Sequence, residues 1–378
     1  MLSLSLKMKM RTEFYDFCFL SSYSIVIFIS FLQQSNAKMN YDSYLSNSKL
    51  GGCDIFQGSW VYDETYPLYD TSKCRFIESE FDCQKNGRSD KMYLKYRWVP
   101  SGCALPRFDG PKLLEKIKGK KIMFVGDSLS LNQWQSLTCM LHASLPQSNY
   151  TIDRKGSLST FTLHEFDVSL ILSRNAFLVD LVEEKIGTVL KLDSIENGKD
   201  WKGYDMLIFN TWHWWLHKGT NQPWKFIEDG KTIRKDMDRL IAFKKGLSTW
   251  SKWVDTNINP NNTTVFFQGI SPTHYRGDEW NETKSTCMGQ TRPISGKTYP
   301  GGSLEEAMAV KQILAKMKVA VTLLDITTLS QLRKDGHPSS FGNYGTVKGN
   351  DCSHWCLAGV PDTWNQLLYA ILLQNHHH

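Results

Sequence analysis

Two short stretches that lie far apart in the chain carry residue types suited to acyl-transfer chemistry. Gly126-Asp127-Ser128 follows an apolar run, and Asp351 and His354 lie near the far end of the chain, within one local turn of each other. A serine becomes a nucleophile when an imidazole takes its proton and a carboxylate orients that imidazole. Ser128, His354 and Asp351 are therefore the candidate catalytic residues.

The elements that must position this serine can be read from the flanking residues. Residues 121–126 are typical of a buried strand that turns sharply at its glycine, and residues 129–137 are typical of a helix. Ser128 is thus expected at the carboxyl end of a strand and at a helix N-terminus, whose free N–H groups can face an oxyanion. Asp127 is expected to start the helix rather than to act as the triad acid.

The order of these motifs distinguishes between hydrolase families. The serine is preceded by Asp127 and followed by Leu129, so it does not form the Gly-x-Ser-x-Gly turn of the α/β-hydrolases. The Asp-x-x-His motif comes late and is followed by a predicted helix at 362–373. The arrangement resembles that of GDSL/SGNH enzymes.

The first residues are typical of a targeting segment. Lys7, Lys9 and Arg11 precede a mostly apolar stretch at 14–32, and small residues follow at 35–37. Residues 1–37 are therefore interpreted as a cleaved signal peptide or a single-span anchor, and 38–52 as a short polar stem. Either interpretation places the remainder in the secretory lumen.

Cysteine usage agrees with an oxidising compartment. Of the 9 cysteines, Cys18 lies in the apolar stretch, and the even remainder predicts four disulfides. The alternative is a metal site around Cys352, His354 and Cys356. It is less favoured because no second cluster of metal-ligand spacing accompanies it, so the sequence predicts no metal.

Charge and sequons agree with a lumenal protein as well. The net charge of +6 is spread along the chain, which argues against nucleic-acid binding. Glycosylation sequons occur at Asn149, Asn261, Asn262 and Asn281.

The chain divides into two regions that differ in amino-acid composition and in secondary-structure pattern. Residues 53–108 are rich in cysteines and aromatics, which predicts a small disulfide-bonded subdomain, and 109–375 form the catalytic domain. In this second region, strand patterns at 121–126, 161–180, 204–210, 265–269 and 319–325 alternate with helical patterns at 111–121, 234–255 and 304–317. Alternation of this kind predicts an α/β fold with a mostly parallel sheet. Ligands of such sheets bind at the carboxyl ends of the strands, where Ser128, Asn210 and Ser271 fall.

Residues near these strand ends are further candidates for the site. The amide of Asn210 can donate a hydrogen bond to an oxyanion, or it can simply cap a turn. Trp212, Trp214 and Trp215 are expected to divide between the core and a platform for sugar rings. Among the other histidines, His213 is interpreted as structural, His274 as shaping a loop near the cleft, and His337 as a weaker rival of His354.

Three stretches of the chain resemble the plant trichome birefringence-like family, whose catalytic part is called the PC-esterase domain. They are the opening 53–61 with 66–69 and 86–88, the nucleophile motif 125–134, and the closing motif 351–357 with 361–365. The resemblance implies an SGNH-like three-layer sandwich and O-acetylation of plant cell-wall polysaccharide, with Ser128, His354 and Asp351 as the triad. The segment 210–215 departs from the family pattern, because Trp212 stands where glycine is usual.

The resemblance also implies particular pairs and partners. The expected disulfides are Cys53–Cys103, Cys74–Cys139, Cys83–Cys356 and Cys287–Cys352. No bound cofactor is expected, only an acetyl donor as co-substrate, and the expected location is the Golgi membrane with a lumenal catalytic domain, with secretion to the wall as the alternative. Pectin and xylan both remain open as the acceptor. An acetylesterase with the same triad and a non-catalytic polysaccharide-binding protein are the alternative functions.

Overall fold

A central sheet of seven strands forms the middle layer of the protein. The computed structural model describes residues 49–50, 52–342 and 349–374, so the expectations for the signal segment lie outside the described residues. The strand order is β15-β14-β11-β5-β8-β7-β6. The five strands from β15 to β8 run parallel to one another, β7 pairs antiparallel with β8, and β6 pairs antiparallel with β7. The strands are β5 (Lys121–Gly126), β6 (Tyr150–Lys155), β7 (Leu158–Leu163), β8 (Val168–Arg174), β11 (Met206–Phe209), β14 (Thr264–Gln268) and β15 (Val321–Leu324).

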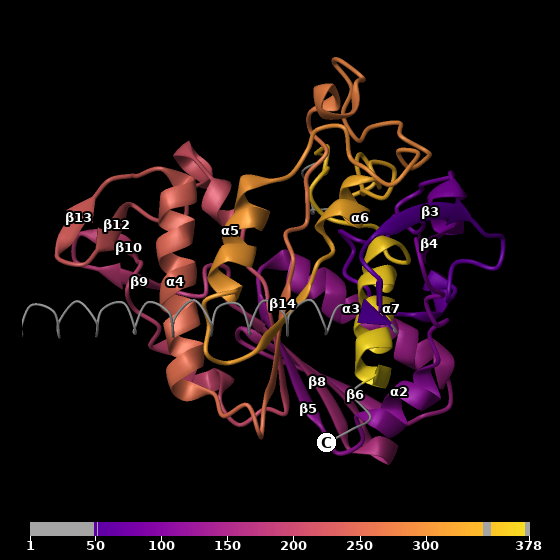
Figure 1. Cartoon of the computed structure of the whole chain (residues 1–378), viewed down its shortest axis with the longest axis horizontal. Coiled ribbons are helices and arrows are strands. Elements are labelled where there is room, and N and C mark those ends of the chain that lie inside the picture. Colours follow the sequence, from indigo (N-terminus) through magenta and orange to yellow (C-terminus); the bar gives the residue numbers. More distant parts are fainter. Residues whose placement is uncertain (1–48, 51, 343–348, 375–378) are drawn as a thin grey trace, which may run out of the picture.

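Helices cover both faces of this sheet (Figure 1). On one face lie α2 (Gly110–Lys116), α3 (Ser128–Ser144) and α7 (Val360–Gln374), and on the other α4 (Arg239–Asn257) and α5 (Glu305–Leu314). Neighbouring strand residues alternate between the two cores: Phe124 and Ile208 belong to the cluster that includes α3 and α7, and Val125 and Phe209 to the other. The expected three-layer α/β sandwich is confirmed.

The N-terminal subdomain packs against the α3 and α7 side. It contains β1 (Lys49–Leu50), β2 (Cys53–Asp54), β3 (Gly58–Tyr62) and β4 (Tyr96–Pro100). Trp98 belongs to the same hydrophobic core as α3 and α7. The Trp60 indole N–H donates at 2.7 Å to the carbonyl of Leu329, which lies within α6 (Thr327–Gln331). The subdomain is therefore continuous with the catalytic core rather than a separate body.

A second sheet of four strands was not predicted from the sequence. Its order is β13-β12-β10-β9, and it lies beyond α4 in Figure 1. The strands are β9 (Asp180–Glu184), β10 (Gly187–Lys191), β12 (Phe226–Asp229) and β13 (Thr232–Arg234). The 3-10 helices are Thr71–Lys73, Met92–Lys95, His164–Phe166, Asn197–Trp201, His213–Leu216, Gly219–Asn221 and Gly277–Trp280.

Several predicted boundaries were wrong, for identifiable reasons. The helix predicted at 234–255 begins at Arg239, because Asp238 accepts from the Ile241 N–H and caps it, and 232–234 belong to β13. The helix predicted at 111–121 ends at Lys116, and Gly119 then takes a positive φ of 72° that leads the chain into β5. The strand β6, whose burial pattern is mostly exposed, was missed.

Four disulfides join the eight cysteines of the described chain. The pairs are Cys53–Cys103, Cys74–Cys139, Cys83–Cys356 and Cys287–Cys352, the same pairs that the family resemblance implies. Because Cys352 is bonded to Cys287 and Cys356 to Cys83, neither sulfur can serve as a thiolate ligand, which removes the alternative of a metal site at these cysteines. Cys83–Cys356 links the N-terminal subdomain to the segment that carries His354.

Candidate active site

The nucleophile lies in a tight turn between β5 and α3. Ser128 is the first residue of α3, and the Oδ1 of Asp127 accepts from the Leu129 N–H at 2.9 Å, which caps the helix. A Cβ at position 126 would lie 2.5 Å from the Asn210 carbonyl oxygen and closer still to Ser130 Oγ. Glycine is therefore required at this turn because two neighbours occupy the space of a side chain.

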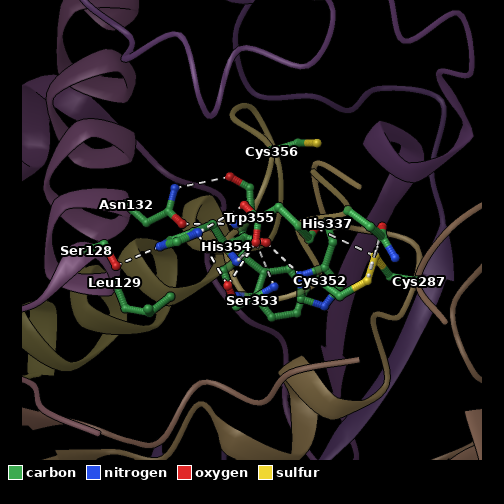
Figure 2. Close-up of polar contacts among 12 residues, drawn as sticks. Ser128, Leu129, Asn132, Cys287, His337, Cys352, Ser353, His354, Trp355 and Cys356 are labelled. Carbon is green, nitrogen blue, oxygen red and sulfur yellow. Dashed lines mark hydrogen bonds and ion pairs between the residues drawn. A yellow bond between two sulfur atoms is a disulfide. The ribbon is translucent and has the colours of Figure 1, made fainter. Parts of the chain in front are cut away.

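The three candidate catalytic residues meet at this turn, and Figure 2 shows Ser128 and His354 in contact. His354 Nε2 lies 2.6 Å from Ser128 Oγ, and His354 Nδ1 lies 3.0 Å from Asp351 Oδ2. The other carboxylate oxygen, Oδ1, accepts from the Ser353 N–H at 2.9 Å and its hydroxyl at 2.8 Å. Because the carboxylate only accepts, Nδ1 carries the proton and Nε2 presents its lone pair to the serine. This geometry suits general-base activation of a serine.

Electrostatics favour a charged imidazole at this position. Burial lowers the pKa of His354, but the hydrogen bond and charge of Asp351 outweigh burial, so the net pKa lies above the ordinary value. The carboxylate of Glu80, from the N-terminal subdomain, acts in the same direction. The imidazolium that forms during acyl transfer is therefore stabilised.

The segment that carries His354 is held from several sides. Ser339 and Asp351 exchange main-chain hydrogen bonds at 2.7 and 3.0 Å, and disulfides leave from Cys352 and Cys356 on either side of the histidine. Asn132, on α3, makes two hydrogen bonds with the main chain of Trp355 (Figure 2). Sequence reasoning did not single out Asn132, and its four-residue spacing from Ser128 on one helix face was the signal that could have found it.

Asn210 lies beside the nucleophile turn, as expected of a residue at the end of β11. Its main-chain N–H donates to the Val125 carbonyl at 2.9 Å, and its Cβ is 3.1 Å from the place of a Cβ at Gly126. The side chain is buried, and its Oδ1 has no hydrogen-bond partner among the described residues. This location is compatible with a role at the oxyanion, which remains a proposal.

The three tryptophans after Asn210 occupy different environments. Trp215 is 0 % exposed and donates to Thr211 Oγ1 at 2.8 Å, so it is core and cannot stack on a sugar; its assignment as a substrate residue is corrected. Trp212 is 7 % exposed, packs edge-on against Phe243 and borders a surface hollow with Glu306. Trp214 is half-buried, with its ring 4.8 Å from that of His217. Trp214 is the one with surface left for a ligand.

The three other candidate histidines each contact a main-chain carbonyl oxygen rather than the nucleophile. His213 Nε2 contacts the Ser271 carbonyl at 2.8 Å, and burial lowers the pKa of His213. His274 and His337 are both buried, 2.6 Å apart, beneath Trp355. His337 therefore is not the catalytic histidine that its sequence context allowed.

Two surface features lie apart from the triad. A hollow of about 1310 Å³ is formed by the N-terminal subdomain between Glu64 and Lys95 and includes no triad residue. The sequon residues Asn149, Asn261, Asn262 and Asn281 are all exposed.

The described residues contain no cluster of histidine, cysteine and carboxylate side chains that could hold a metal ion. No described helix is long and apolar enough to cross a membrane.

Comparison with known proteins agrees with this geometry. Residues 105–371 match the PC-Esterase family, described as a GDSL/SGNH-like acyl-esterase family found in Pmr5 and Cas1p, and residues 51–104 match the PMR5 N-terminal domain. The chain belongs to the PC-Esterase family.

Its curated relatives in Arabidopsis thaliana cover most of the chain. Protein trichome birefringence-like 38 is 57% identical over 325 residues, which is 86% of this chain and 85% of the relative. Protein trichome birefringence-like 41 is also 57% identical, over 85% of this chain and 91% of the relative. Protein trichome birefringence-like 39 is 52% identical over 90% of this chain and 92% of the relative. The chain belongs to the trichome birefringence-like family. It carries an acyl-esterase-type domain, that of an acyl-transferring or hydrolytic enzyme.

Proposed function

We propose that this protein is an O-acetyltransferase that transfers acetyl groups to a plant cell-wall polysaccharide, pectin or xylan, through Ser128, His354 and Asp351. The observation that carries the proposal is the unbroken relay from Ser128 Oγ to His354 and on to Asp351, at 2.6 and 3.0 Å. Membership of the trichome birefringence-like family supports the polysaccharide acceptor.

The first half of the reaction forms an acetyl-enzyme. Ser128 Oγ attacks the carbonyl carbon of the acetyl donor while its proton passes to His354 Nε2, and Asp351 stabilises the imidazolium. The negative oxygen of the tetrahedral intermediate is stabilised by N–H groups at the start of α3 and by the Asn210 amide. When the intermediate collapses, the bond to the donor's leaving group breaks, and that group takes the proton from His354.

The second half returns the enzyme to its starting state. A sugar hydroxyl gives its proton to His354 Nε2 as its oxygen attacks the acetyl carbonyl. Collapse of this second intermediate breaks the bond to Ser128 Oγ, which recovers the proton from His354. The acceptor leaves as an O-acetylated sugar, and no cofactor is consumed.

An acetylesterase is the second candidate, favoured by the acyl-esterase description of the matched family. Water would replace the sugar hydroxyl in the second half, with the same residues. The two differ in whether the acceptor or water reaches the acetyl-enzyme, because exclusion of water decides this competition.

Mass spectrometry of the products separates these candidates. The protein is incubated with an acetyl donor and with oligogalacturonide or xylo-oligosaccharide acceptors, and acetylated oligosaccharide is expected. Loss of acetyl groups from pre-acetylated oligosaccharides, with release of acetate, would instead establish the esterase. Ser128→Ala is the control, and acetyl turnover that persists in this variant would reject the triad for both reactions.

We also propose that the enzyme acts in the Golgi lumen, anchored through its N-terminal segment, with glycans at the exposed sequons. Support comes from the basic residues before the apolar stretch 14–32 and from the disulfides, which form in the secretory pathway. N-terminal sequencing of protein from the plant tests the anchor. A mature N-terminus at Lys38 in the wall fraction would reject it and favour a secreted enzyme.

A further inference from the structure

A pair of buried histidines lies directly behind the catalytic segment. His274 comes from the loop after β14, and His337 from the loop after α6. His274 Nδ1 lies 2.6 Å from His337 Nε2, and His337 Nδ1 lies 2.6 Å from the main-chain oxygen of His354 (Figure 2 shows His337 and His354). A chain of contacts therefore leads from His274 through His337 to the backbone of the catalytic residue.

The contact with His354 determines where His337 carries its proton. A carbonyl oxygen only accepts, so Nδ1 of His337 must be the donor. Burial lowers the pKa of His337 well below its ordinary value, which makes the ring neutral and leaves Nε2 without a proton. The contact between the rings is then a hydrogen bond only if His274 donates from its own Nδ1. The Nε2 of His274 also faces an acceptor, the Gln331 carbonyl oxygen, so a neutral His274 makes one of these two hydrogen bonds and leaves the other unmade.

We propose that His337 is a positioning residue for the catalytic histidine: its Nδ1–H holds the main chain of His354 at the distance that Ser128 requires. The proposal rests on the proposed triad function. His337 is well suited to this role because its ring stacks on that of Trp355, with the centroids 4.0 Å apart, and cannot turn away. The Arg88 side chain holds the carbonyl of His337 itself at 3.0 Å.

Lowering the pH is not expected to break the contacts of His274 and His337. His274 Nε2 lies 2.8 Å from the Gln331 carbonyl oxygen, so a proton on both nitrogens of His274 would add a hydrogen bond and remove none. Burial lowers the pKa of His274 to about 4. The charged and titratable groups that face the pair are Arg88 and Lys334, Asp351 and His354. The two cations oppose protonation and therefore help to keep the pair neutral.

Three substitutions of His337 test whether activity depends on the hydrogen bond of its side chain or only on the volume that the side chain fills. An asparagine places an amide N–H near the position of Nδ1, a glutamine places one near that of Nε2, and a phenylalanine keeps only the ring. His337→Asn should retain most of the activity of the wild-type enzyme. His337→Gln and His337→Phe should lower kcat roughly 10- to 100-fold with little change in KM, because the general base is misplaced. The acid limb of their pH profile should also move to lower pH, because His354 withdraws from Asp351.

Equal loss in all three variants, with an unchanged pH profile, would reduce His337 to a packing residue and overturn the proposal. Nitrogen-15 NMR of the histidines in the intact wild-type protein tests it without substitution. The expected signature is a protonated Nδ1 and an unprotonated Nε2 on His337 at neutral pH, and the opposite tautomer would also overturn the proposal. Since this signature does not depend on turnover, it stands even if Ser128→Ala shows that the proposed acetyl transfer is wrong.

Discussion

The side chain of Asn132 makes two hydrogen bonds with the main chain of Trp355, the residue after the catalytic histidine. The amide nitrogen donates to the Trp355 carbonyl at 3.1 Å, and the amide oxygen accepts from the Trp355 N–H at 3.0 Å. Both partners are buried. Since Asn132 lies one helical turn after Ser128, a single side chain sets the distance between the nucleophile helix and the histidine segment.

Asn132→Ala should therefore impair both stability and catalysis. Two buried main-chain groups lose their partners, which costs about 1–3 kcal/mol each, and kcat should fall at least about tenfold as His354 shifts. Chemical denaturation and steady-state kinetics measure the two effects.

The matched control is Asn365→Ala. Asn365 is also a buried asparagine, whose amide donates to the Gln133 carbonyl and to Ser136 Oγ on α3, but it contacts no triad residue. This variant should lose comparable stability and keep the kcat of its folded fraction. An equal fall in kcat in both variants would contradict a specific role of Asn132.

The dependence of activity on pH should report the raised pKa of His354. Catalysis requires the neutral imidazole, so kcat/KM should fall as the pH decreases through this pKa, and the midpoint should lie above the ordinary histidine value of 6.5. The ion pair with Asp351 stabilises the folded protein at low pH, and this contribution is lost as the pH rises through the same pKa. An acid limb centred below 6.5 would contradict the assignment.

Asp351→Asn should remove both effects of the carboxylate. The pKa of His354 should fall because its hydrogen-bond and charge partner is lost. The turnover should fall roughly 10⁴-fold, because an amide favours the wrong tautomer of the imidazole. Rates measured at several pH values would separate the two: the lower pKa should move the acid limb to lower pH, whereas the loss caused by the wrong tautomer should persist on the plateau at high pH.

Asn210→Ala should lower kcat roughly 100-fold or more, with little effect on KM, if its amide donates to the oxyanion. The matched control is Gln268→Ala, because Gln268 is a buried amide at the corresponding end of the neighbouring strand β14. Single-turnover acetylation of Ser128 measures the step concerned. Similar losses in both variants would indicate damage to the sheet edge rather than loss of an oxyanion donor.

Removing the Cys287–Cys352 disulfide should reduce activity more than removing Cys53–Cys103. The two bridges span 65 and 50 residues and should each contribute about 4 kcal/mol by restricting the unfolded chain. Only the first is adjacent to Asp351. Double Cys→Ser variants should thus lose comparable stability, whereas kcat should fall mainly in the Cys287→Ser/Cys352→Ser protein. A larger kcat loss on removal of Cys53–Cys103 would contradict this expectation.

The sequence by itself determined the local features of this protein. The strand, turn and helix around Ser128 and the pairing of Asp351 with His354 depend on residues within a few positions of one another, so composition and periodicity are enough to predict them. The alternation of strands and helices likewise determined the three-layer fold, because a parallel sheet must be covered on both faces.

Only the tertiary structure decided which side chains meet across the chain. Asn132 and Trp355 are separated by 223 residues, and His274 and His337 by 63, and neither contact follows from any local pattern. The tertiary structure also decided that Trp215 is core while its neighbour Trp214 keeps exposed surface. The physical reason is that burial and hydrogen bonding depend on what the other layers bring to a position, whereas the local sequence determines only the element on which that position lies.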